Sequence, residues 1–157
     1  MRGKRFMNEQ KYTVQSESET EKLGAALAKR LLDAGERFAF IALRGEMGVG
    51  KTAFTRGFCR HLGIDAVHSP TYTVVNEYKG GAYPVLHFDM YRIERVEELY
   101  SIGFEDYLAK DAYLLCEWSE NIEPYLPPYA IFVTLTRTEK DGEREILIED
   151  PSERIKL

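Results

Sequence analysis

The stretch of the sequence with the clearest chemical signature is Gly45–Thr52, which reads GEMGVGKT. It fits the phosphate-binding pattern G-x-x-x-x-G-K-[ST] at every fixed position. Glycines allow positive φ angles and close approach of the backbone, so successive amide N–H groups can converge on phosphate oxygens. Lys51 supplies an ammonium group for the outer phosphates, and the Thr52 hydroxyl can bind a magnesium ion. The spacing therefore predicts a site for a nucleotide with magnesium.

The flanking sequence supports this interpretation. Residues 38–43 form an unbroken apolar run, typical of a strand that is buried on both faces. After the loop, Phe54, Phe58 and Leu62 recur every fourth residue, which indicates a helix, and Gly63 stands where that helix would end. The order strand, glycine loop, helix is the one that a phosphate-binding loop requires. The alternative is that the glycines form only a tight turn.

The composition is typical of one globular domain. The chain has 157 residues, 44% of them hydrophobic and 12% aromatic, which is enough to bury a core. A net charge of −5 argues against a broad nucleic-acid-binding face. No stretch is apolar and long enough to span a membrane, and the first ten residues lack the apolar segment of a secretory signal. We expect a cytoplasmic protein with a flexible segment at residues 1–10 and one P-loop domain at residues 11–157.

Two cysteines, Cys59 and Cys116, are too few for a disulfide framework or a zinc site, so we expect both to be small core residues.

The pattern of apolar runs and turns predicts an α/β fold of the P-loop NTPase type, with a central mixed β-sheet flanked by helices. A first helix should start at Ser18–Glu21, which has the form of a capping box, and end at Gly35. Its expected apolar face consists of Leu23, Ala26, Leu27 and Leu31. Expected strands are residues 11–15, 38–43, 73–78, 85–88, 112–116, 130–136 and 145–148.

Two pairs of these strands should form hairpins, one around residues 79–81 and one around Asp141-Gly142. A short helix is indicated by helical spacing of apolar residues at Val96, Leu99 and Ile102. Prolines at positions 124, 127 and 128 argue against regular structure there.

Two acidic residues stand where apolar strands end, Asp89 and Glu117. In open α/β sheets ligands gather outside the carboxyl ends of strands, and a magnesium ion needs more oxygen ligands than Thr52 provides. Both acids could therefore point at the nucleotide, or they could be solvated strand-end residues. His87 precedes Asp89 by two residues and so faces the same side of its strand, where it could transfer protons or serve as a structural histidine.

Three further side chains have two interpretations each. Thr71 could reach the outer phosphate as a nucleotide-sensing switch, or satisfy local backbone groups in a turn. Arg92 could bind a phosphate or pair with Glu94 or Glu97. Trp118, the single tryptophan, could cover the site or fill the core.

Four motifs, in chain order, resemble those of the bacterial TsaE family, also called YjeE. They are Gly45–Thr52, Ser69–Tyr72, His87–Arg92 and Glu117-Trp118. The glycine loop alone is common to many families, but its combination with the other three motifs is specific. The resemblance covers nearly the whole chain.

This resemblance implies a small ATPase that is needed to make threonylcarbamoyladenosine in certain tRNAs. Transfer of the carbamoyl group would be carried out by partner proteins, the TsaB-TsaD pair, on whose complex the ATPase would act. Contact with tRNA would be indirect, through these partners. ATP and Mg²⁺ are the implied ligands.

The resemblance also implies roles for individual residues. The expected catalytic residues are Asp89, Lys51 and Thr71, and the expected magnesium ligands are Thr52 and Glu117. The expected nucleotide-binding residues are Glu46, Met47, Gly48, Val49, Gly50, Lys51, Thr52, Ala53 and Trp118. Met47, Val49 and Ser119 differ from the commoner residues of the family, but none of these changes removes a charged or hydroxyl group that the chemistry uses.

No arginine finger can be assigned within the chain, so hydrolysis should be slow without partners. Two alternatives remain, a small kinase and a nucleotide-controlled binding module in which hydrolysis is incidental. A GTPase is disfavoured because no Asn-Lys-x-Asp element occurs. The adenine could lie near residues 11–16 and the hairpin at Arg137.

Overall fold

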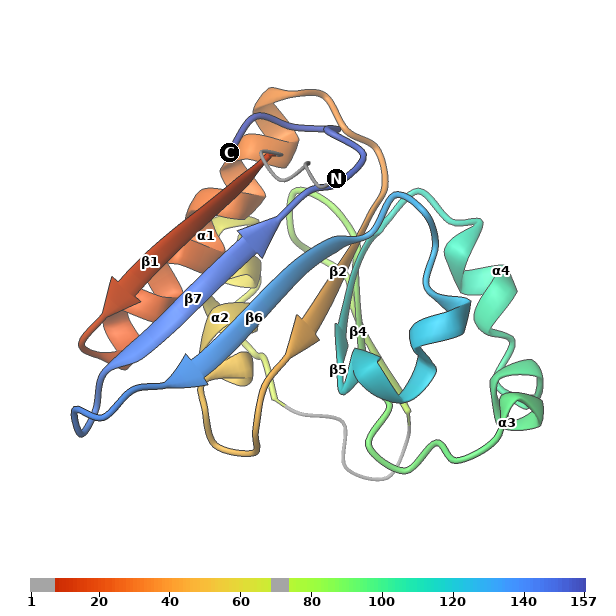
Figure 1. Ribbon diagram of the computed structural model, residues 1–157. Helices are drawn as coiled ribbons and strands as arrows, with labels where there is room; N and C mark the ends of the chain where they lie inside the picture. Colours follow the sequence, from red (N-terminus) through yellow and green to blue (C-terminus); the bar gives the residue numbers. More distant parts are fainter. Residues whose placement is uncertain (1–7, 69–73) are drawn as a thin grey trace.

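A computed structural model describes residues 8–68 and 74–157, and these build a mixed sheet with helices on both faces (Figure 1). The strand order is β1-β7-β6-β2-β5-β4-β3. The strands are β1 (Glu9–Val14), β2 (Ala39–Arg44), β3 (Val75–Tyr78), β4 (Val85–Asp89), β5 (Tyr113–Glu117), β6 (Ile131–Arg137) and β7 (Arg144–Glu149). The helices are α1 (Glu17–Asp33), α2 (Lys51–His61), α3 (Val96–Ser101), α4 (Phe104–Leu108) and the 3-10 segment η1 (Ser119–Tyr125).

The centre of the sheet is parallel. β2 pairs in parallel with both β5 and β6, and β5 pairs in parallel with β4. These strands are rich in apolar residues because both of their faces are covered. Their shared direction brings the carboxyl ends of β2, β4 and β5 to the same edge, which confirms the predicted α/β fold with a mixed sheet.

The outer strands are antiparallel, and both predicted hairpins are confirmed. β1 pairs with β7 from Glu9 onward, so it begins two residues earlier than the expected start at Lys11. The side-chain amide of Asn8 donates to Asp150, 3.3 Å away. Residues 8–10, which we had expected to belong to a flexible end, are therefore held against the last part of the chain.

Two cores form, one on each face of the sheet. The larger lies under α1 and α2 and contains Phe54, Phe58 and Leu62, as the periodicity predicted. The smaller lies under α3, α4 and η1 and contains Phe88 and Phe104. Both cysteines are buried and free, and burial raises the pKa of Cys59 to about 12. Within the described residues no helix is both long and apolar enough to cross a lipid bilayer.

The cap of α1 corrects one prediction. The hydroxyl of Ser16 accepts the N–H of Glu19 at 3.2 Å, so the capping residue is Ser16 and not Ser18. Both serines are followed by a glutamate three residues later, but only the earlier start is observed. The buried face also differs, because Ala26 is exposed whereas Gly24 and Ala28 are buried.

The segments that cover the smaller core also differ from the sequence prediction. The structure adds α4 after α3, with Gly103 at φ 73° between them. It also places η1 where prolines were expected to exclude regular structure. η1 consists of two short turns that meet at a kink at Ile122, so Pro124 lies near the start of the second turn, where its missing N–H is tolerated.

Close contact between α1 and α2 depends on two glycines. A Cβ at Gly24 would lie 2.1 Å from the carbonyl oxygen of Phe54, and one at Gly57 would lie 1.9 Å from that of Glu21. Because both obstacles are backbone atoms, a side chain at either position would push the helices apart. Across this contact, Glu21 also pairs with Arg56 and Arg60, at 2.7 and 3.0 Å.

We predict that Gly57→Ala destabilises the protein although alanine favours helix by about 1 kcal/mol over glycine. Separating the helices should cost more than this gain, so the net loss of unfolding free energy should be about 2 kcal/mol in urea denaturation. Ala26→Gly on the exposed face of α1 is the control and should cost about 1 kcal/mol from propensity alone. A Gly57→Ala variant as stable as the unchanged protein would contradict the packing argument.

Candidate functional site

The glycine loop joins β2 to α2 and has the backbone that its sequence predicted. Gly45, Gly48 and Gly50 have φ angles of 145°, 76° and 121°. At Gly45 the constraint is also steric, since a Cβ there would lie 2.6 Å from the carbonyl oxygen of Leu135. α2 then begins at Lys51, so the N–H groups of its first turn and its positive dipole end face the loop.

Lys51 is buried, with 5% of its surface exposed. Its ammonium group donates to the carbonyl oxygen of Gly45 at 2.5 Å and lies 4.0 Å from the ring centre of Trp118. Burial lowers the pKa of Lys51, and the nearby carboxylates of Glu117, Glu120 and Asp89 act in the opposite direction. The lysine is therefore a cation held inside the site among negative charges.

The two strand-end acids lie side by side. Asp89 and Glu117 are the last residues of β4 and β5 and occupy partner positions in the parallel ladder. Desolvation raises the pKa of Asp89, and the charge of Glu117 adds to this rise. The N–H of Tyr91, 2.9 Å from the Asp89 carboxylate, counteracts it. Asp89 is thus a partly buried carboxylate with increased affinity for a proton.

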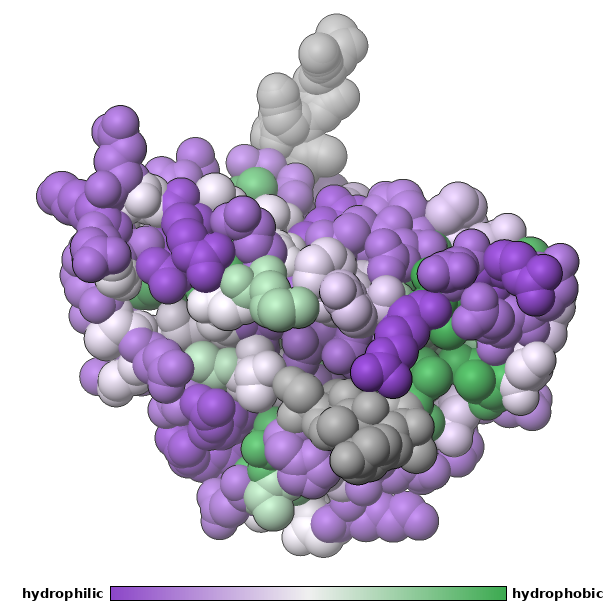
Figure 2. Space-filling view, turned by 90° about the horizontal axis from the view of Figure 1, so that it is seen from below, coloured by the Kyte–Doolittle hydropathy of each residue, from purple (hydrophilic) through white to green (hydrophobic). Residues whose placement is uncertain are grey.

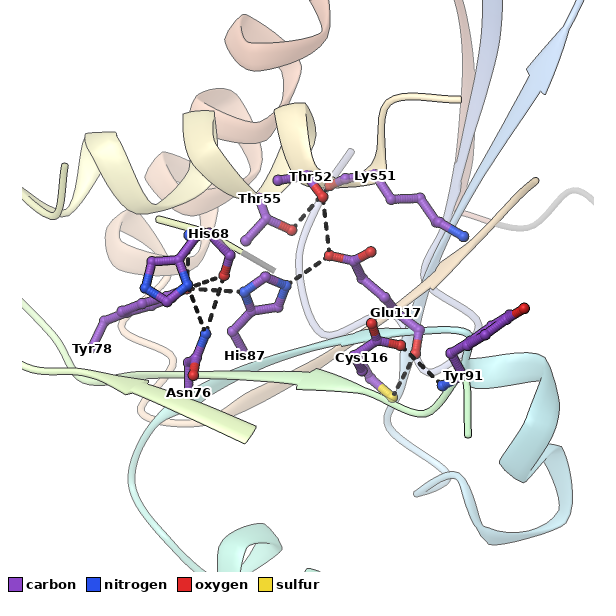
Figure 3. Close-up of polar contacts among 11 residues, drawn as sticks. Lys51, Thr52, Thr55, His68, Asn76, Tyr78, His87, Tyr91, Cys116 and Glu117 are labelled. Atoms are coloured by element: carbon purple, nitrogen blue, oxygen red, sulfur yellow. Dashed lines mark hydrogen bonds and ion pairs between the residues drawn. The ribbon is translucent and has the colours of Figure 1, made fainter. Parts of the chain in front are cut away.

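The Glu117 carboxylate forms polar contacts with one residue of α2 and one residue of β4 (Figure 3). Its Oε2 lies 2.7 Å from Nε2 of His87 and 3.4 Å from the Thr52 hydroxyl, which donates to it. His87 is fully buried on the same face of the sheet as Asp89 and Glu117, as its position two residues before Asp89 predicted.

Trp118 turns the chain away from the sheet directly after Glu117. It has φ 59° and ψ 38°, a left-handed conformation that is unusual for a residue other than glycine. This turn directs the indole over Lys51 and to within 5.1 Å of the Tyr91 ring. Trp118 lines the pocket, and it also packs against the smaller core, so the structure contains elements of both interpretations from the sequence.

These groups line a pocket of about 320 Å³. Its lining includes the predicted residues Met47, Gly48, Gly50, Lys51, Thr52, Ala53, Asp89, Glu117 and Trp118. Two predicted residues point elsewhere: Glu46 pairs with Arg137 at 3.0 Å, and Val49 packs in the larger core. Thr71 lies outside the described residues.

Three residues of the pocket were not predicted, namely Glu17, Arg56 and Tyr91. Arg56 follows Thr52 by one helical turn, a spacing that could have placed it at the site. It is paired with Glu21 at 2.7 Å and with Glu17 at 3.8 Å. Arg92 is exposed, and the structure describes no ion pair between it and the two glutamates considered as partners from the sequence.

A second, larger hollow of about 470 Å³ lies on α3, α4 and Tyr125, away from the glycine loop. The surface at the carboxyl edge of the sheet is mainly hydrophilic, with apolar areas toward the end that carries α3 and α4 (right in Figure 2). The residues that line this hollow include no lysine or arginine, so the smaller, charged pocket is the candidate site.

The comparisons with known proteins identify the family of the chain. The family model described as "Threonylcarbamoyl adenosine biosynthesis protein TsaE" matches residues 14–146. The chain belongs to the TsaE family. Membership of TsaE connects this chain with biosynthesis of the tRNA modification threonylcarbamoyladenosine.

Relatives named "tRNA threonylcarbamoyladenosine biosynthesis protein TsaE" occur in several bacteria. The one from Bacillus subtilis is 40% identical over 107 residues, 68% of this chain and 66% of the relative. The one from Haemophilus influenzae is 41% identical over 101 residues, 64% of each chain. The chain thus spans about two thirds of the length of these two relatives. With the relative from Treponema pallidum, identity is 32% over 85% of this chain and 95% of the relative.

A solved structure is similar throughout the fold. The crystal structure of Bacillus subtilis YdiB superposes with a TM-score of 0.76 at 28% identity, covering 94% of this chain and 88% of YdiB. The fold is therefore shared over most of both chains.

Two arginines of the β6–β7 hairpin hold the glycine loop from outside. Arg137 donates to the carbonyl oxygen of Met47 at 3.1 Å, and Arg144 donates to that of Val49 at 3.1 Å. A loop rich in glycine has many accessible conformations, so such contacts restrict it to the observed one.

We predict that Arg144→Ala raises amide hydrogen exchange in the loop at Gly48–Gly50. Loss of one hydrogen bond of about 1 kcal/mol should increase local opening about fivefold. Arg30→Ala is the matched control, because Arg30 also donates to a backbone carbonyl, that of Lys156, far along the chain from the loop. Equal exchange in the unchanged protein and the Arg144→Ala variant would refute the restraint.

Proposed function

We propose that this protein binds Mg-ATP at the glycine loop, hydrolyses it slowly and, through this cycle, acts on the TsaB-TsaD complex that completes threonylcarbamoyladenosine on tRNA. The observation that carries the proposal is the convergence of Lys51, Thr52, Asp89 and Glu117 on one pocket. These are the group types that phosphoryl transfer requires: a cation and backbone N–H groups for the phosphates, and oxygen ligands for a divalent ion.

The donor set fits magnesium. Thr52 offers a hydroxyl and Glu117 a carboxylate, both oxygen ligands, and Mg²⁺ is commonly held by one or two such groups together with phosphate oxygens and water. Within the described residues no group of three or more His, Cys, Asp or Glu side chains has a metal-binding arrangement. When bound, the ion would neutralise charge on the phosphates.

The roles of the protein groups follow from their positions. Lys51 and the N–H groups at the start of α2 would bind phosphate oxygens and stabilise the charge that develops during transfer. Asp89, the partly buried acid with the raised pKa, would orient the attacking water or accept its proton. Trp118 would cover the side of the pocket next to Lys51.

The surroundings of the pocket support slow hydrolysis by the isolated protein. The arginine that lines it, Arg56, is engaged with Glu21 and Glu17. An arginine supplied to the transferring phosphoryl group is worth roughly 10³–10⁵ in rate in related chemistry. A partner protein is the natural source of such a group or of a rearrangement that frees one.

We predict that nucleotide binding changes the fluorescence of Trp118, the single tryptophan, because its ring lies 4.0 Å from the Lys51 ammonium. Titration with Mg-ATP should give a saturable change, and Lys51→Met should weaken the apparent affinity at least tenfold by removing a buried phosphate ligand. Trp118→Phe, which has no tryptophan signal, serves as the blank. A flat titration of the unchanged protein, confirmed by calorimetry, would exclude the proposed function.

For hydrolysis, we predict that Asp89→Asn lowers the rate of phosphate release about 100-fold or more while ATP affinity stays within about threefold, since general-base groups contribute roughly 10²–10⁴. Addition of the TsaB-TsaD pair should raise the rate of the unchanged protein but not that of the variant. Glu94→Gln, an exposed acid in the same part of the chain, is the control.

Two outcomes would favour other functions. Full support of tRNA modification by Asp89→Asn would favour a nucleotide-controlled binding module. A rate that stays flat with stoichiometric TsaB-TsaD would contradict the dependence on partners.

A further inference from the structure

His87 is a fully buried histidine with a partner at each ring nitrogen (Figure 3). Nε2 lies 2.7 Å from Oε2 of Glu117, and Nδ1 lies 3.1 Å from the hydroxyl oxygen of Tyr78. The ring therefore connects the expected magnesium ligand on β5 with a tyrosine at the end of β3. An imidazole held at both nitrogens has one fixed orientation.

Tyr78 is itself fixed by the chain on its far side. Its hydroxyl donates to the carbonyl oxygen of His68 at 2.8 Å and accepts the N–H of the same residue at 3.2 Å. The amide of Asn76, which is paired with His87 across the β3–β4 ladder, also donates to the His68 carbonyl oxygen, at 3.1 Å. A hydrogen-bonded series thus runs from the His68 backbone through Tyr78 and His87 to Glu117.

The carboxylate of Glu117 is oriented by this series. Oε2 faces His87 and is also the atom that accepts from Thr52. Glu117 is 5% exposed and lines the pocket with its carboxylate, so fixing Oε2 determines which way the second oxygen, Oε1, is presented. A glutamate has three rotatable side-chain bonds, and an ion that had to order them on binding would bind less tightly.

We propose that His87, held by Tyr78, is a positioning residue that presets the Glu117 carboxylate for a divalent cation bound with the nucleotide. The inference rests on the proposed function and assigns no proton transfer to His87. Partners of this kind next to a metal ligand typically change metal affinity by 10–100-fold when they are removed. Affinity for the nucleotide without metal should not depend on His87, because its ring contacts neither the loop nor Lys51 in the described network.

The test separates metal affinity from nucleotide affinity. For metal affinity, the protein is titrated with Mn²⁺ in the presence of a saturating non-hydrolysable ATP analogue, and free Mn²⁺ is measured by electron paramagnetic resonance. For nucleotide affinity, the protein is titrated with the analogue without metal, and the fluorescence of Trp118 is measured. His87→Leu should raise the half-saturating Mn²⁺ concentration at least tenfold and leave analogue affinity without metal within about twofold. His87→Gln, whose amide can reach the position of Nε2, should restore most of the Mn²⁺ affinity.

Two tyrosine variants provide a matched pair. Tyr78→Phe removes the hydroxyl that holds His87 and should weaken Mn²⁺ binding about threefold. Tyr113→Phe removes a comparable hydroxyl, which donates to the Glu36 carbonyl oxygen at 2.7 Å, and should leave Mn²⁺ affinity unchanged. If His87→Leu does not fold, as judged by thermal unfolding, the comparison of Tyr78→Phe with Tyr113→Phe decides the question.

The outcomes distinguish this inference from the function on which it rests. Mn²⁺ affinity that is the same in the unchanged protein, in a folded His87→Leu variant and in Tyr78→Phe would overturn the positioning role alone. Equal losses in Tyr78→Phe and Tyr113→Phe would also overturn it, since they would reflect general destabilisation. Failure of the unchanged protein to bind the analogue with Mn²⁺ would overturn the proposed function and this inference together.

Discussion

Glu117 is a carboxylate almost removed from solvent, and its burial constrains the elements around it. A buried carboxylate is costly unless charged or hydrogen-bonding groups surround it. Here His87 comes from β4, the Thr52 hydroxyl from the first turn of α2, and the positive charge of Lys51 from the same turn. Because these partners belong to separate elements, β4, β5 and the start of α2 must meet at one point, and that point is the pocket.

The remainder of the fold holds α2 in this position. Gly24 and Gly57 allow α1 to lie against α2 with backbone nearly in contact, and Arg144 fixes the loop that precedes the helix. After β5, Trp118 adopts a left-handed backbone conformation. For a residue with a side chain, this conformation raises the conformational free energy by about 1–2 kcal/mol. Such strain is common at functional sites, and here it brings the indole over Lys51.

Much of this arrangement could be predicted from the sequence because its signals are local. The loop, the apolar strands and both hairpins have short-range patterns. The parallel pairing of β4 and β5 brings Asp89 and Glu117, at the ends of these strands, together. Gly24 could not be recognised as a contact residue, since its role depends on Phe54 of another helix. The partners of His87 are likewise set by packing between strands, so the sequence left its role open between proton transfer and structure.

The proposed function requires a divalent ion, bound together with ATP, between Thr52 and Glu117 in front of the glycine loop. The most direct measurement is a crystal structure with Mn²⁺ and a non-hydrolysable ATP analogue, with the ion located by its anomalous scattering. We expect one peak, bound by the Thr52 hydroxyl and by Glu117 directly or through one water, with the triphosphate on the N–H groups of Gly48–Thr52. A peak held by Asp89 without Glu117, or phosphates that lie away from the loop, would contradict the account.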